Sequence, residues 1–184
     1  IWIKSYEQNS NKMKPKVKIV HSNYYYHEVI EAMVILAKKN LKDSGIDTDT
    51  IGVPGSFEIP YEIARSIKKD TVDNLKKMSS FKGKNKAEIR ENILQIAKLS
   101  QLNLNNQCIY SGYLALGCII KGQTTNHQSI STSIFTNLQR ISIENLMPIS
   151  NGIFNANDID EALEKCSKCA EQSVHVISTF VKGK

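Results

Sequence analysis

The sequence lacks any apolar run that approaches the roughly 20 residues of a membrane-spanning helix. Residues 1–16, IWIKSYEQNSNKMKPK, have neither the apolar centre nor the small-residue cleavage site of a secretory signal. The chain also begins with isoleucine instead of methionine, so we expect that a preceding segment is missing or has been removed. Together these absences predict a cytoplasmic protein that has no membrane partner.

The four cysteines do not supply the ligands of a structural zinc site. Cys166 and Cys169 form a CxxC pair, which taken alone suggests zinc or redox chemistry. Such a site needs a second pair of similar spacing, and Cys108 and Cys118 are too far apart in the sequence to form one. Cys118 falls in an apolar stretch, and the CxxC pair falls within a helical pattern. We therefore expect buried or inert thiols and predict no metal site.

Acidic residues are scarce in one region, and that region carries most of the positive charge. Of the formal net charge of +6, residues 68–107 contribute five charges, because nine Lys/Arg stand there against four Asp/Glu. No known nucleic-acid motif accompanies this charge. A basic segment on an otherwise neutral domain is typical of a solvent-exposed loop. We therefore predict no nucleic-acid partner, and we keep nucleic-acid binding through this segment as an alternative.

The chain of 184 residues is long enough for one domain with a proper core. Runs of apolar and β-branched residues predict four strands, near residues 17–23, 50–54, 108–120 and 147–154. Helical spacing of apolar residues predicts helices near residues 27–43, 59–69, 130–141 and 157–181. Strands that alternate with helices predict the α/β class, here a three-layer α/β/α fold with a four-stranded parallel sheet.

The regular pattern stops at about residue 70 and resumes near residue 107. The intervening segment is rich in Lys, Asn and Ser, and it contains one predicted helix at residues 86–101. It is too short and too poor in aromatic residues to be a second domain. We predict a basic polar insertion at about 70–107 within a single domain of residues 17–184, which follows an N-terminal tail of residues 1–16.

Several polar segments are predicted to meet at one edge of the sheet. Ligands of parallel α/β sheets bind beyond the carboxyl ends of the strands, which places residues 23–25, 55–58, 122–127 and 151–155 together. The stretch ALGCIIKGQTTNHQSIS, residues 115–131, passes from an apolar run through a glycine turn and hydroxyl residues into a helix. That order is typical of an anion site built from backbone N–H groups.

Three motifs resemble the 6,7-dimethyl-8-ribityllumazine synthase family of riboflavin biosynthesis. VPGSFEIP (53–60) is similar to the family's VPG[AS]FE[IL]P, and ALGCIIKGQT (115–124) is similar to ALGxxIxGxT. PISNGIFNANDIDEALEK (148–165) resembles PVxFGVLTxxxxEQAxER without a gap. The resemblance covers nearly all of the chain apart from residues 1–16 and the insertion.

The resemblance implies a flavodoxin-like four-stranded parallel sheet between helices. It implies a transferase that condenses 5-amino-6-(D-ribitylamino)uracil with 3,4-dihydroxy-2-butanone 4-phosphate to 6,7-dimethyl-8-ribityllumazine, the penultimate step of riboflavin biosynthesis. No metal or cofactor takes part in that reaction. The family forms homopentamers, or shells of several pentamers, with sites between adjacent subunits, so we expect a homo-oligomer.

The resemblance also assigns roles to individual residues. The pyrimidine and ribityl chain are expected to contact Tyr24, Ser56, Phe57, Glu58, Ile119, Ile120 and Asn151. The phosphate is expected to contact Gly122, Gln123, Thr124 and Lys165. Three of the family's side chains are replaced here: a phenylalanine by Asn151, an arginine by Lys165 and a lysine by Cys169.

The catalytic position departs from the family pattern, which has a histidine two residues after the motif threonine. That position is Asn126 here, and a histidine follows one place later, at His127. The apolar stripe of residues 130, 134, 138 and 141 includes the residue four after Asn126, which argues against a slip of one residue. Either His127 reaches the site and handles protons, or it has no role and Asn126 only orients groups. The alternative function is a non-catalytic ligand-binding or shell-forming homologue that has lost the proton-shuttling histidine.

Overall fold

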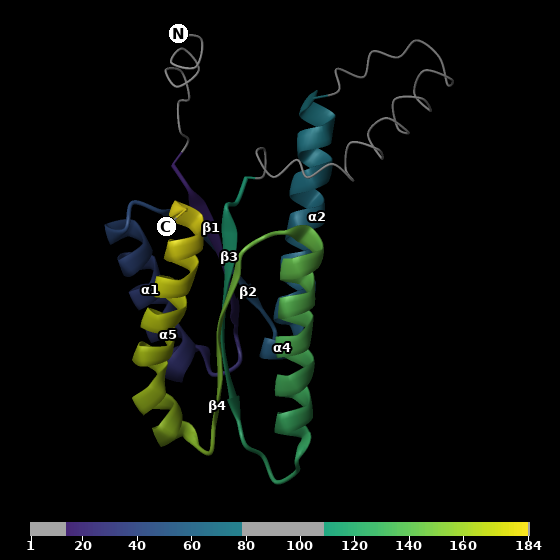
Figure 1. Ribbon diagram of the computed structural model, residues 1–184. Helices are drawn as coiled ribbons and strands as arrows, with labels where there is room; N and C mark the ends of the chain where they lie inside the picture. Colours follow the sequence, from purple (N-terminus) through teal and green to yellow (C-terminus); the bar gives the residue numbers. More distant parts are fainter. Residues whose placement is uncertain (1–13, 79–108, 184) are drawn as a thin grey trace.

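The structure, a computed structural model, describes residues 14–78 and 109–183. Four parallel strands form one sheet in the order β2-β1-β3-β4 (Figure 1). The strands are β1 (Lys16–Ser22), β2 (Asp47–Val53), β3 (Gly112–Ile120) and β4 (Ile149–Ala156). The predicted four-stranded parallel sheet is therefore confirmed.

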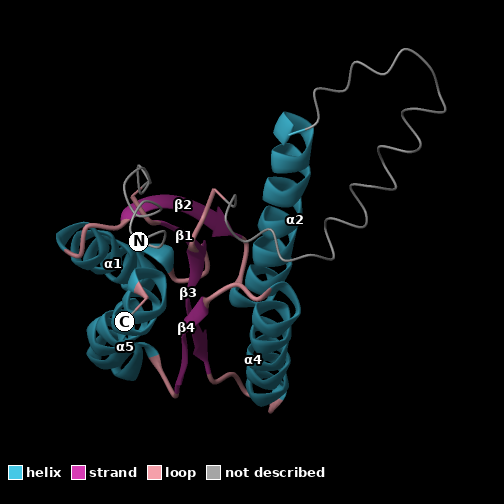
Figure 2. Ribbon diagram, turned by 45° about the horizontal axis from the view of Figure 1, so that its top comes forward, coloured by secondary structure: helices cyan, strands magenta, loops and turns pink. Residues whose placement is uncertain are grey.

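Helices follow each strand and cover both faces of the sheet (Figure 2). A π-helix (Tyr26–Ile30) leads into α1 (Glu31–Asp43), and a 3-10 turn (Ser56–Glu58) leads into α2 (Ile59–Met78). Helix α4 (Asn126–Asn145) follows β3, and α5 (Ile159–Lys182) follows β4. Helices α1 and α5 lie on one face and α2 and α4 on the other, which confirms the three-layer α/β/α class.

Two apolar cores result from the alternation of side chains along the strands. On β3, Leu114, Leu116 and Cys118 face α1 and α5, whereas Tyr113 and Ala115 face α2 and α4. All five side chains are buried. Because β3 has another strand on each side and helices over both faces, it is apolar almost throughout its length.

Helix α2 extends nine residues beyond the predicted end at residue 69, so the prediction was wrong at that boundary. The polar composition after residue 69 suggested a loop, but lysine, asparagine and aspartate do not stop a helix as proline or glycine does. The structure therefore gives helical conformation to residues 70–78, the first part of the predicted insertion. The predicted helix at 86–101, residues 1–13 and Cys108 lie outside the described residues.

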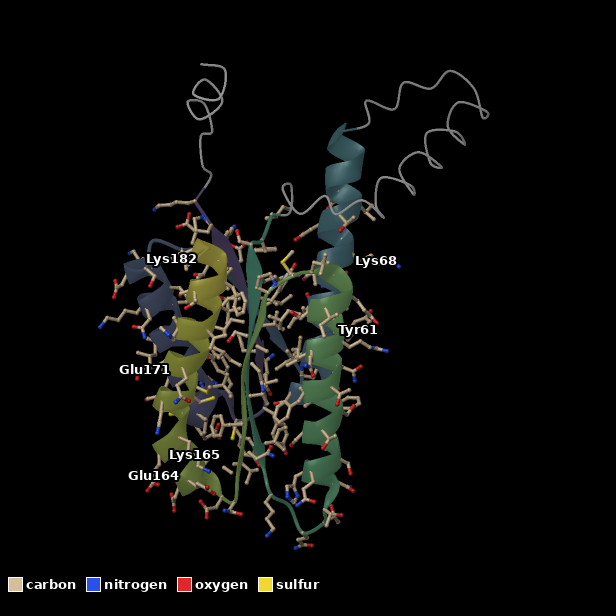
Figure 3. All side chains as sticks on the ribbon, viewed as in Figure 1. Tyr61, Lys68, Glu164, Lys165, Glu171 and Lys182 are labelled. Atoms are coloured by element: carbon tan, nitrogen blue, oxygen red, sulfur yellow. The ribbon has the colours of Figure 1, made fainter. Side chains whose placement is uncertain are left out.

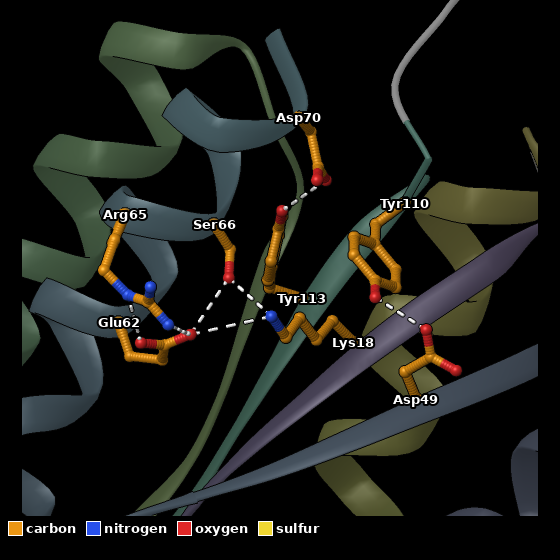
Figure 4. A network of polar contacts seen from close by, with 8 residues as sticks. All are labelled: Lys18, Asp49, Glu62, Arg65, Ser66, Asp70, Tyr110 and Tyr113. Atoms are coloured by element: carbon orange, nitrogen blue, oxygen red, sulfur yellow. Dashed lines mark hydrogen bonds and ion pairs between the residues drawn. The ribbon is translucent and has the colours of Figure 1, made fainter. Parts of the chain in front are cut away.

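Buried polar side chains join α2 to the amino-terminal half of the sheet (Figure 4). The ammonium nitrogen of Lys18 lies 2.6 Å from Ser66 Oγ and 3.6 Å from Glu62 Oε1. Arg65 donates two hydrogen bonds of 2.8 and 3.0 Å to the same carboxylate. Farther along α2, the buried Asp70 accepts a hydrogen bond of 3.4 Å from the Tyr113 hydroxyl. This network lies toward the end of the sheet opposite the predicted site.

None of the described helices is both long and apolar enough to span a membrane.

Candidate active site

The loop after β1 presents an exposed aromatic ring beside the sheet edge. Tyr24 is 63% exposed, and its backbone N–H donates a 3.0 Å hydrogen bond to the Ser22 hydroxyl. The next residue, Tyr25, has left-handed backbone angles (φ 56°, ψ 34°), which are uncommon for a residue with a side chain. Its ring meets that of Tyr24 edge to face, with centroids 4.7 Å apart. The turn therefore fixes Tyr24 as an accessible stacking surface.

The turn after β2 packs closely against β3. The buried Ser56 hydroxyl donates a 3.4 Å hydrogen bond to the Cys118 carbonyl oxygen. A Cβ atom at Gly117 would lie only 2.6 Å from Ser56 Oγ, so the turn can sit here only because position 117 has no side chain. Phe57 is 58% exposed and Glu58 is half-buried, which leaves both available to a ligand.

The loop after β3 exposes backbone donors at the start of α4. Gly122, Gln123 and Thr124 are all exposed. Thr125 occupies the N-cap position but forms no side-chain cap hydrogen bond, so its hydroxyl satisfies none of the first free N–H groups of the helix. An anion is favoured at such a helix start by these N–H groups and by the helix dipole. The predicted phosphate segment is therefore exposed and lies directly before the start of this helix.

His127 lies closer to the protein interior than Asn126 does. Asn126 is exposed, whereas His127 is half-buried and its Nδ1 lies 3.1 Å from the Thr124 carbonyl oxygen. A carbonyl oxygen only accepts, so Nδ1 is the donor in this contact, and Nε2 is the ring nitrogen left to exchange a proton with a ligand.

The buried side of α4 also differs from the predicted stripe. Ser131, four residues after His127, is buried, whereas Ile130 is only half-buried. Ile134, Leu138 and Ile141 are buried as expected. The register argument placed Ser131 outside the buried face, and this part of the prediction was wrong. The reason is a hydrogen-bonded partner on β4, Asn155, which the apolar pattern cannot indicate.

Lys165 is already paired within its own helix. Its ammonium contacts the carboxylate of Glu161, one turn earlier on α5. That contact, together with N–H donation from Asn157, holds the pKa of Glu161 below its usual value. Asp158 caps the same helix by accepting from the Glu161 N–H, at 2.9 Å. A phosphate that binds Lys165, which is labelled on α5 in Figure 3, must therefore compete with Glu161 for the ammonium.

Asn151 does not lie at the sheet edge with the other residues, so its placement there was wrong. The register pairs Asn151 with Ala115, four residues before Ile119, which corresponds to about 13 Å along a strand. Its side-chain oxygen accepts a 2.9 Å hydrogen bond from the Ile153 N–H. Ile119, which is buried, and Ile120, which is half-buried, end β3 at the edge itself. Only the last part of the 151–155 segment reaches that edge.

The described cysteines are covered by the core between the sheet and α5. Cys118 and Cys166 are buried, and Cys169 is half-buried beside them. Burial raises the pKa of Cys118 to about 12 and that of Cys169 to about 11, so both remain protonated thiols at neutral pH. These three bear out the prediction of buried thiols. Among the described residues, no group of three or more His, Cys, Asp or Glu side chains is arranged to hold a metal ion.

Comparison with known proteins gives one consistent result. A sequence model of the family described as 6,7-dimethyl-8-ribityllumazine synthase matches residues 14–76 and 87–182. The 6,7-dimethyl-8-ribityllumazine synthase of Buchnera aphidicola subsp. Baizongia pistaciae is 36% identical over 162 residues, which covers 86% of this chain and 78% of that protein. The enzyme of the same name from Azoarcus sp. (strain BH72) is 25% identical over 181 residues, with 95% and 91% coverage. That of Afipia carboxidovorans is 27% identical over 150 residues, with 82% and 71% coverage.

Proposed function

Since the chain belongs to the 6,7-dimethyl-8-ribityllumazine synthase family of riboflavin biosynthesis, we propose that it carries out the family's condensation. The substrates are 5-amino-6-(D-ribitylamino)uracil and 3,4-dihydroxy-2-butanone 4-phosphate, and the products are 6,7-dimethyl-8-ribityllumazine, inorganic phosphate and water. The observation that carries this proposal is the family match combined with the exposure of Tyr24, Phe57 and the 122–124 loop along one sheet edge.

The pyrimidine end of the site is formed by the turns after β1 and β2. The exposed Tyr24 ring stacks on the pyrimidine, as an aromatic face does on other flat rings. The Ser56 side chain is used inside the protein, so its contribution to the substrate comes from the backbone. Glu58 accepts from ribityl hydroxyls, while Phe57 and the end of β3, Ile119 and Ile120, supply apolar contact.

The phosphate end of the site is the start of α4. Gly122 leaves room for the phosphate oxygens, since no atom lies within 4 Å of the position that a Cβ would take there. The N–H groups of Gln123 and Thr124, with the Thr124 hydroxyl, donate to the phosphate, and the helix dipole favours its negative charge. Binding both substrates in one orientation accounts for most of the acceleration, because it replaces a bimolecular encounter.

Proton transfer falls to His127 in this scheme. Imine formation removes one water, inorganic phosphate then leaves, and ring closure onto the remaining carbonyl removes a second water, so protons move to and from nitrogen and oxygen at each stage. The free Nε2 of His127 can accept and return a proton, whereas the amide of Asn126 can only orient groups. General acid–base assistance of this kind is typically worth roughly 10²–10⁴-fold.

We also propose that the chain works as a cytoplasmic homo-oligomer, a pentamer or a multiple of pentamers. An apolar groove of about 720 Å³ between α2 and α4 and another of about 370 Å³ beside β4 support this assembly. Tyr61 in the first groove and Phe180 in the second are 71% and 67% exposed. In such an assembly Asn151 and Lys165 serve the site of a neighbouring subunit.

The test is turnover of both substrates by the parent chain, Asn126→His and His127→Ala, followed by lumazine absorbance and fluorescence. We expect activity in the parent, a loss of roughly 10²-fold or more in His127→Ala, and no loss in Asn126→His. Full activity in His127→Ala would remove His127 from the mechanism.

The second candidate function is a non-catalytic ligand-binding or shell-forming homologue. It is favoured by the exposed Asn126 at the family's histidine position and by the pairing of Lys165 with Glu161. This candidate predicts no product in the parent above the uncatalysed rate, but binding of the pyrimidine substrate with normal stoichiometry. Product formation by Asn126→His alone would identify a lapsed enzyme whose pocket is intact.

A further inference from the structure

A buried hydroxyl in the first turns of α4 forms two hydrogen bonds that the apolar core does not require. Ser131 is 4% exposed. Its Oγ lies 2.6 Å from the His127 carbonyl oxygen and 2.6 Å from the side-chain oxygen Oδ1 of Asn155, at the end of β4. Both contacts are short for hydrogen bonds between such groups. They connect the turn that carries His127 to a strand two dozen residues away in the sequence.

The Ser131 hydroxyl is the donor of this pair of contacts. Both partners, the His127 carbonyl oxygen and Asn155 Oδ1, are acceptors, so the one hydroxyl proton is shared between them. The Ser131 hydroxyl therefore links the turn that carries His127 to the side chain of Asn155 at the end of β4.

The same strand holds the other end of the loop. The Lys121 N–H donates a 2.9 Å hydrogen bond to the carbonyl oxygen of Ala156, the residue after Asn155. Consecutive residues of β4 thus fix both ends of the segment 121–131. Between these two attachments lie the proposed phosphate contacts and the half-buried His127, whose ring is bonded to the Thr124 carbonyl.

We propose that Ser131 and Asn155 are positioning residues for the reaction, and that this pair sets the distance between the phosphate contacts and the His127 ring. The inference rests on the proposed function, and it concerns residues that contact neither substrate. Without the pair, the first turn of α4 remains helical but loses its lateral attachment to β4. The loop 122–125 then shifts relative to His127, and the hydrogen bond that fixes the imidazole tautomer weakens.

The test uses the full chain with Ser131→Ala, Asn155→Ala and the double variant. Thr132→Ala is the matched control, because it removes an exposed hydroxyl from the adjacent position of the same helix. The first measurement is the imidazole 15N spectrum of His127 without substrates. We expect the Nδ1–H tautomer to dominate in the parent and the control, and to give way to a mixture in the other three variants.

The second measurement separates kcat from the two KM values. We expect kcat/KM for the phosphate substrate to fall on the order of ten- to hundredfold in each single variant, with little change in the KM of the pyrimidine. The double variant should be no worse than either single variant, because both remove one chain of hydrogen bonds. The proposal would be overturned if the KM values of both substrates rose equally, or if the effects of the two substitutions on kcat/KM were additive in the double variant.

The two measurements keep this inference separate from the condensation itself. If the parent makes no lumazine but the His127 spectrum changes as expected, the positioning role stands and the proposed reaction fails. If the spectrum is the same in all variants, the positioning role is overturned whether or not the parent is active.

Discussion

The contact between Gly117 and Ser56 offers a quantitative test of how the site is built. In Gly117→Ala the new Cβ would lie 2.6 Å from Ser56 Oγ and 3.3 Å from Ile153 Cγ1. Contacts below 3 Å force the backbone or the neighbouring side chain to move, and overpacking of this kind costs roughly 1–3 kcal/mol. We therefore expect Gly117→Ala to lower the free energy of unfolding by about 2 kcal/mol.

The second substitution relieves the first. Ser56→Ala removes the oxygen at 2.6 Å and leaves the nearest contacts of the new Cβ at 3.3 Å, which small shifts accommodate. Alone, Ser56→Ala loses one hydrogen bond of 3.4 Å to the Cys118 carbonyl, a cost of about 1 kcal/mol. The double variant should be no less stable than Gly117→Ala, which corresponds to a coupling of about 1–2 kcal/mol between the two positions.

The assay is urea unfolding of the parent, the two single variants and the double variant. Stability is compared from the unfolding midpoints, provided that the dependence of the unfolding free energy on urea concentration is the same in all four. Gly122→Ala serves as the control, because a Cβ there meets no atom within 4 Å and should alter stability by less than about 0.5 kcal/mol. Additive effects at Gly117 and Ser56 would refute the reasoning, because they would mean that the turn after β2 is not packed on β3.

Three further predictions concern charged groups. Glu62→Leu should lower the free energy of unfolding by about 3 kcal/mol, because it leaves the half-buried ammonium of Lys18 without its ion pair. Lys18→Met should lower it by about 1 kcal/mol, because Arg65 still pairs with Glu62; equal urea midpoints for the two variants would contradict this. Burial raises the pKa of Asp70 above its usual 3.8, so its stabilising contribution is complete below that value and is lost as the pH rises through the folded-state pKa. Asp70→Asn should therefore gain stability relative to the parent as the pH rises from below 3.8 through the folded-state pKa, and a constant difference in urea midpoints would rule this out. Glu161→Gln frees Lys165 and should lower the KM of the phosphate substrate roughly two- to fivefold, whereas Glu164→Gln, which removes an exposed acid next to Lys165 in the sequence, should change it little.

Much of the fold could be predicted because its signals are local. The apolar run of β3 and the helical spacing in α1, α4 and α5 indicate elements without knowledge of their partners. The end of α2 could not be predicted, because polar residues without glycine or proline are compatible with either a helix or a loop. The left-handed backbone of Tyr25 likewise has no local signal, since tyrosine is not a residue type that favours a positive φ.

The candidate site could be predicted in outline but not in register. The strand-end rule correctly collected Tyr24, the Ser56 turn and the 122–127 loop on one edge. It misplaced Asn151, because the position of a residue along β4 depends on pairing with β3, which the sequence of β4 does not reveal. The predicted inward stripe of α4 does pack in the core, but the burial of Ser131 was missed for a similar reason, since its partner Asn155 lies on another element.

The central claim is that this chain catalyses the condensation, and one measurement tests it most directly. Both substrates are incubated with the purified chain, and lumazine and inorganic phosphate are quantified together over time. We expect both to appear in a one-to-one ratio, at a rate that is proportional to protein concentration and above that of the uncatalysed reaction. Lumazine formation at the uncatalysed rate at every protein concentration would contradict it.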